Sequence, residues 1–128
     1  MPLDNLRLEK IRDQTIGWLK EIADNEGVGS KMEIDPNSEP VACQVRNKGK
    51  KLVMELHRPD TRVEPETVYK MFLKILLTES DKGAIIYSSE ISDEVGNLAK
   101  LYGINLIPMK TRSGMERSLK KIFVDVFS

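Results

Sequence analysis

The sequence predicts a three-layer α/β fold, with helices on both faces of a central mixed sheet. Two observations support this prediction. Two β-prone runs joined by a short polar segment indicate an antiparallel hairpin within residues 41–57. Residues 84–107 then follow the order strand, helix, strand, which requires parallel neighbours and a right-handed crossover. We expect a single domain over residues 1–128, because two separate cores in a chain of this length would each be marginal.

The composition excludes several classes of protein. With 40% hydrophobic and 31% charged residues, the chain is too apolar for disorder. It also lacks the run of about 20 apolar residues that a transmembrane helix needs. One Cys and one His allow neither an intramolecular disulfide nor a Cys/His zinc site. The N-terminus has no basic segment followed by an apolar one, so we expect no signal peptide, no membrane partner and a cytoplasmic location.

The first predicted element is a helix from Asp4 to about Asn25. Its apolar side chains recur every three to four residues, and Asp4 is a candidate for its N-cap. Residues 31–35 alternate weakly and predict a short strand or an extended loop. The expected buried stripe of the helix is Leu8, Ile11, Thr15, Trp18, Leu19 and Ile22.

The predicted hairpin places two polar residues side by side. Its strands are Val41–Arg46 and Lys51–His57, and the Asn-Lys-Gly-Lys segment between them predicts the turn. Because side chains alternate along a strand, Glu55 and His57 point to the same face. This pair is the most informative feature of the sequence.

The rest of the chain predicts three helices and two strands. A Glu-Pro-Glu tripeptide after residue 63 opens the first helix. The apolar run Ala84–Tyr87 suits a strand buried on both faces, and Ser92 caps a helix that precedes a strand at Ile104–Ile107. Ser113 and Glu116 have the spacing of a capping box for the last helix. The expected buried stripes are Val68, Phe72, Ile75 and Leu76, then Val95, Leu98, Ala99 and Tyr102, and finally Met115, Leu119, Ile122, Phe123 and Val126.

Four stretches in this order carry a resemblance to a known family. They are residues 51–58, 63–72, 83–89 and 91–107, and they lie within residues 8–108. Together they resemble the restriction endonuclease-like fold, in particular its Mrr-type branch, which is similar to archaeal Holliday-junction resolvases. In that family a short apolar strand ends in a Ser or Thr turn, an acidic helix follows, and a Gly-Ile-x-Leu-Ile strand closes the unit.

The resemblance implies a metal site on the hairpin. In that family an Asp on the first strand, and an Asp or Glu followed by a spacer and a Lys on the second, hold a magnesium-type ion and water against the scissile phosphate. Here Glu55 is the second-strand carboxylate, His57 occupies the lysine position and Ala42 the aspartate position. A single carboxylate such as Glu55 is at most a weak metal ligand, so we expect no cofactor and no cleavage. In the alternative, an active Mg²⁺-dependent endonuclease recruits a displaced carboxylate from Asp35, Glu33, Glu39 or Glu21.

Other readings of these residues remain open. Glu55 and His57 are either the remnant of a catalytic site or two polar residues on a solvated edge. Cys43 lies among apolar residues and is expected to be a small buried side chain rather than a nucleophile. Trp18 is expected in the core rather than as a base-stacking platform.

The net charge of zero conceals blocks of opposite sign. Residues 46–62 carry six Lys or Arg and two Asp or Glu, and residues 110–128 carry five and two. The first block flanks Glu55 and is a candidate phosphate-binding surface, although charges also keep hairpin tips soluble and protect sheet edges. The predicted nucleic-acid contacts are Arg46, Lys48, Lys50, Lys51, Arg58 and Arg62.

The sequence therefore predicts a nuclease-like domain that does not cleave and that acts in DNA binding or as an assembly module. A third hypothesis is a homodimerisation module. In that case a sheet edge, or the last helix with Phe123 and Phe127, forms the contact.

Overall fold

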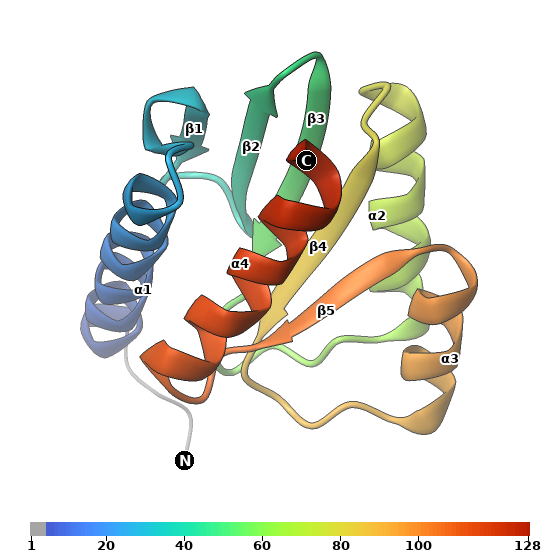
Figure 1. Ribbon diagram of the computed structural model, residues 1–128. Coiled ribbons are helices and arrows are strands. Elements are labelled where there is room, and N and C mark those ends of the chain that lie inside the picture. Colours follow the sequence, from blue (N-terminus) through green and yellow to red (C-terminus); the bar gives the residue numbers. More distant parts are fainter. Residues whose placement is uncertain (1–4) are drawn as a thin grey trace.

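The computed structural model describes residues 5–128 (Figure 1). Their five strands form one sheet in the order β1-β2-β3-β4-β5. β1 (Met32–Asp35), β2 (Val41–Asn47) and β3 (Lys50–Leu56) are antiparallel, whereas β4 (Lys82–Tyr87) and β5 (Ile104–Pro108) continue the sheet parallel to β3. This mixed sheet confirms the predicted α/β class.

Helices cover both faces of the sheet, as Figure 1 shows. α1 (Asn5–Asn25) and α4 (Arg112–Phe127) pack on one face, and α2 (Pro65–Leu77) and α3 (Asp93–Leu101) pack on the other. Because strand side chains alternate, each face has its own apolar core. We call these the α1/α4 face and the α2/α3 face.

The hairpin forms where the sequence predicts it. Lys48 and Gly49 connect β2 to β3 with φ angles of 54° and 76°. Two consecutive positive φ angles are typical of the two-residue turns whose twist matches that of the flanking strands. The short segment before the hairpin is the strand β1, which follows a 3₁₀ turn (Gly29–Lys31) and pairs with β2.

Of the two helix N-caps predicted for α3 and α4, one is confirmed and one is wrong. Ser92 caps α3 as expected, because its hydroxyl accepts a hydrogen bond from the Val95 N–H at 3.2 Å. The capping box predicted at Ser113 is wrong. Thr111 is the N-cap of α4, and its hydroxyl accepts from the Gly114 N–H at 3.0 Å, so the helix begins before Ser113. Asp4, the predicted cap of α1, lies outside the described residues.

The buried stripes are mostly as expected, with one informative error. In α1, Ile16 and Ala23 are buried, whereas Ile11 and Trp18 are only partly buried. In α2, Leu76 was expected inside but is 57% exposed. The apolar residues of α2 cover a wide arc beside one polar stripe (Glu66, Lys70 and Lys74), so their spacing alone does not decide which part of the arc faces the sheet.

Candidate functional site

Glu55 lies on β3, in the middle of the sheet, and His57 directly follows this strand. β3 pairs with β2 on one side and with β4 on the other, so it is not an edge strand. The side chains of Glu55 and His57 are 13% and 9% exposed. The interpretation of this pair as polar residues on a solvated edge is therefore wrong.

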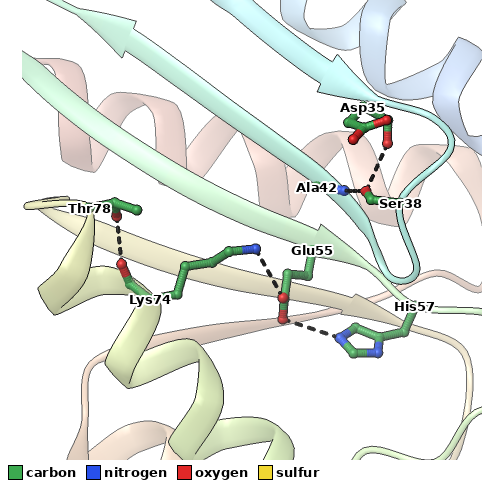
Figure 2. Close-up of polar contacts among 7 residues, drawn as sticks. All are labelled: Asp35, Ser38, Ala42, Glu55, His57, Lys74 and Thr78. Carbon is green, nitrogen blue, oxygen red and sulfur yellow. Dashed lines mark hydrogen bonds and ion pairs between the residues drawn. The ribbon is translucent and has the colours of Figure 1, made fainter.

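A lysine from α2 completes this cluster (Figure 2). Lys74 Nζ lies 3.1 Å from Glu55 Oε2, and His57 Nε2 lies 3.5 Å from Glu55 Oε1. Each oxygen of the carboxylate therefore faces a different nitrogen. The sequence analysis missed Lys74, because its position beside Glu55 depends on how α2 is rotated about its axis.

The environment keeps Glu55 ionised. Burial by itself raises the pKa of Glu55, whereas the contact with His57 and the charge and hydrogen bond of Lys74 lower it, and the net result is a pKa below the ordinary 4.5. At 3.5 Å the His57 contact is at the outer limit of a hydrogen bond, and Nε2 has no closer partner among residues 5–128. We therefore regard the Lys74 ammonium as the firmer partner.

The strand register places Ala42 directly opposite Glu55. Ala42 lies on β2, and Asp35 of β1 is in turn opposite Ala42. These three residues form one row on the α2/α3 face, in which a methyl group occupies the place where the resemblance implies an aspartate. The Asp35 carboxylate is exposed and accepts a hydrogen bond from the Asn37 N–H at 3.1 Å.

The other candidate carboxylates are not gathered at Glu55. Glu33 accepts a hydrogen bond from the Gln44 amide at 2.8 Å, and Glu21 forms an ion pair with Arg112 at 2.9 Å. Glu39 lines a shallow hollow with Arg12 and Arg58. Within residues 5–128 no group of three or more His, Cys, Asp or Glu side chains is arranged to hold a metal ion.

The six predicted phosphate contacts separate into two groups. Arg46, Lys48, Lys50 and Lys51 lie at the hairpin end of β3, whereas Arg58 and Arg62 follow its other end. A strand of seven residues is roughly 20 Å long, so the groups do not form one patch. The second group is also neutralised locally, because Arg58 pairs with Asp60 at 2.9 Å and Arg62 with Glu64 at 3.7 Å.

The hairpin end forms a concave basic surface. Its concavity of about 400 Å³ is lined by the backbone and side chains of the turn and of the segment that joins α2 to β4. Five cations line it against two carboxylates, Glu79 and Asp81. We call these five cations the hairpin cations: Lys31, Arg46, Lys48, Lys50 and Lys51.

Most of the hairpin cations have no carboxylate partner. In the part of the chain that the structure describes, no ion pair involves any of the five. Lys51 instead holds the surface together. Its N–H donates to Asp81 Oδ2 at 2.8 Å, its carbonyl accepts from the Asp81 N–H at 2.8 Å, and its Nζ donates to the Thr78 carbonyl at 3.3 Å. Lys31, which the sequence analysis did not include, joins the surface because β1 pairs with β2.

Cys43 and Trp18 belong to the core on the α1/α4 face. Cys43 is 6% exposed, and burial raises the pKa of its thiol to about 12, so it is not a nucleophile. Trp18 is partly buried and packs against the same core. Phe123 and Phe127 are 4% and 5% exposed, so α4 does not present them as a contact surface.

No protein-family model matches this chain, and no match was found among curated proteins or among solved structures. The restriction endonuclease-like assignment therefore stays a prediction. Among the described helices, none combines the length and the apolar character needed to cross a membrane.

Proposed function

We propose that this chain is a nucleic-acid-binding domain of the restriction endonuclease-like type that does not cleave its ligand, and that it acts in the cytoplasm. The observation that supports binding most directly is the concave surface lined by hairpin cations that form no ion pair within residues 5–128. Lysine and arginine side chains in such a surface gain free energy by neutralising phosphates and releasing the counterions around them.

The composition of the Glu55 cluster supports the loss of cleavage. Mg²⁺ sites use several hard oxygen ligands, and here Glu55 is the one carboxylate in the cluster. Its charge is already compensated by Lys74, and a divalent ion would have to displace that ammonium group or lie against it. Ala42 contributes no ligand at the position opposite Glu55.

The binding proposal is tested by measuring DNA affinity at several salt concentrations. The variant Arg46→Ala/Lys48→Ala/Lys50→Ala removes three hairpin cations and keeps Lys51, which connects the hairpin to the α2–β4 segment. We expect the slope of log K against log salt concentration to fall by about 1 for each lost phosphate contact, and the affinity to fall at every salt concentration.

The matched control removes the same amount of charge elsewhere. Arg117, Lys120 and Lys121 are exposed on α4, on the opposite face of the sheet from α2. The variant Arg117→Ala/Lys120→Ala/Lys121→Ala is expected to retain the wild-type affinity and salt dependence. Equal losses in both variants would show that total charge, and not the hairpin surface, governs binding, and the proposal would be abandoned.

A Mg²⁺-dependent endonuclease is the second candidate, because Asp35 shares a cross-strand row with Glu55. The two residues are separated by one strand, so their backbones are about 10 Å apart, and only the small Ala42 side chain lies between them. DNA incubated with Mg²⁺ or Mn²⁺ distinguishes the candidates. Cleavage by the wild type that both Asp35→Asn and Glu55→Gln abolish would favour the endonuclease.

A further inference from the structure

α2 is apolar on the side that faces solvent as well as on the side that faces the sheet. Val68 and Met71 are fully buried on its inner side. On its outer side Tyr69, Leu73 and Leu76 follow the spacing i, i+4, i+7, which places them in one stripe along the helix. An apolar stripe on a helix is normally covered, and the stripe on the outer side of α2 lies outside its contact with the sheet.

The exposed stripe extends onto α3. Tyr102, at the C-terminal end of α3, contacts both Tyr69 and Phe72, with ring centroids 5.8 Å and 4.5 Å away. Leu101, which precedes Tyr102, is 74% exposed, and Leu77, at the end of α2, is 83% exposed. We call the following five residues the α2/α3 apolar surface: Tyr69, Leu73, Leu76, Leu77 and Leu101.

The charged side chains of α2 are paired within the chain. Lys70, on the outer side of α2, forms an ion pair with Glu66 at 3.3 Å, and Lys74 is directed to Glu55. On α2 itself, therefore, each charge beside the apolar stripe has a partner, so the charges of this helix do not disfavour packing against the same helix of a second copy. The edge strand β1 differs, because it presents the exposed carboxylates of Glu33 and Asp35, which discourage strand pairing.

The size of the surface fits self-association. The five residues of the α2/α3 apolar surface are between 45% and 83% exposed. A large side chain has about 150–200 Å² of surface, so together they expose roughly 500–600 Å² per chain. A patch of this size is at the upper end for a monomeric protein. Two copies that cover it mutually bury roughly 1,000 Å² or more, which is the threshold for a specific interface.

From this geometry we propose that two copies of the chain form a symmetric dimer through their α2 helices, which pack antiparallel with Leu73 at the two-fold axis. In that arrangement Tyr69 of each copy lies against Leu77 of the other, and the two helix dipoles are opposed, which is favourable. The dimer hypothesis from the sequence places the contact at a sheet edge or on the last helix with Phe123 and Phe127, and these two side chains are buried. This inference does not depend on nucleic-acid binding.

The mass of the purified protein in solution tests the dimer. Light scattering coupled to size-exclusion chromatography should give twice the chain mass of 14.6 kDa for the wild type. The variant Leu73→Glu/Leu77→Glu places like charges at the contact and should give the monomer mass. The matched control is Val124→Glu, which changes another exposed apolar residue, on α4, and should remain dimeric.

A folding check and a cross-link complete the test. Because Leu73 and Leu77 are exposed, the double variant should keep the circular dichroism spectrum of the wild type. Leu73→Cys should form a disulfide-linked dimer on oxidation, whereas Val124→Cys should not, because only Leu73 lies near the axis. A monomeric wild type, a Leu73→Glu/Leu77→Glu variant that stays dimeric, or equal cross-linking of both cysteine variants would overturn the proposal.

Discussion

The Glu55 cluster and the hairpin cations differ in whether their charges are paired within the protein. Both belong to β3 and its neighbours, but Glu55 is largely buried and has a cation at 3.1 Å, whereas the hairpin cations border an open concavity and form no ion pair with any residue that the structure describes. A compensated charge holds a helix against a sheet. An uncompensated cluster of like charges destabilises the fold slightly and is available to a ligand of opposite sign. In this chain, the buried Glu55 cluster and the proposed binding surface therefore lie at different positions along one strand.

The largest effect on stability should come from removing the cation of the buried cluster. Lys74→Met leaves the Glu55 carboxylate, 13% exposed, with only the long contact to His57. We expect the free energy of unfolding to fall by about 1–3 kcal/mol, the usual cost of leaving a buried polar group without its partner. Urea unfolding followed by circular dichroism measures this difference.

Lys70→Met is the control for that experiment. Lys70 is on the same helix and also has a carboxylate partner, but its pair with Glu66 is exposed, with side chains 72% and 76% accessible. Such pairs contribute about 0–1 kcal/mol. Equal losses for Lys70→Met and Lys74→Met would mean that Lys74 does not have the special role assigned to it.

A smaller effect is expected from restoring a second carboxylate. Ala42→Asp places an aspartate directly opposite Glu55, at a distance at which two carboxylates can share a divalent ion. The variant should be less stable than the wild type without metal. Mn²⁺ at about ten times its dissociation constant should then return roughly 1.4 kcal/mol, seen as a higher Tm.

The control for the metal experiment is at the same position. Ala42→Asn places a side chain of the same size opposite Glu55 without adding a second carboxylate. Mn²⁺ should not raise the Tm of this variant or of the wild type. If Mn²⁺ stabilises all three proteins equally, the metal binds elsewhere, and the assignment of Ala42 to the vacant ligand position loses its support.

Local signals in the sequence were sufficient for much of the fold. The hairpin was predictable because an Asn-Lys-Gly-Lys segment separates two β-prone runs, and the parallel strands because β4 is a continuous apolar run. The position of Ala42 opposite Glu55 followed from the same hairpin register. These features depend on residues close together in the chain.

The missed features depend on tertiary packing. Lys74 reaches Glu55 because Met71, one turn earlier, faces the sheet, and residues three apart share a helix face. The wide apolar arc of α2 hid this orientation, and Leu76, which is exposed, was therefore predicted to be buried. The separation of Arg58 and Arg62 from the hairpin cations could have been predicted from the sequence. The predicted strand between the two groups is long enough to place them at opposite ends.

The smallest effect should be the pH dependence of the Glu55 cluster. Because the pKa of folded Glu55 lies below 4.5, its ionised form stabilises the fold at pH values above 4.5, and this contribution is lost as the pH falls through the lowered pKa. Glu55→Gln keeps the side-chain size and removes the charge. The wild type should therefore be more stable than Glu55→Gln near neutral pH, by about 1 kcal/mol, and this difference should shrink in acid. Urea unfolding of both proteins at neutral and acidic pH measures it. A difference that stays constant or grows in acid would show that the Lys74 ammonium does not stabilise an ionised Glu55.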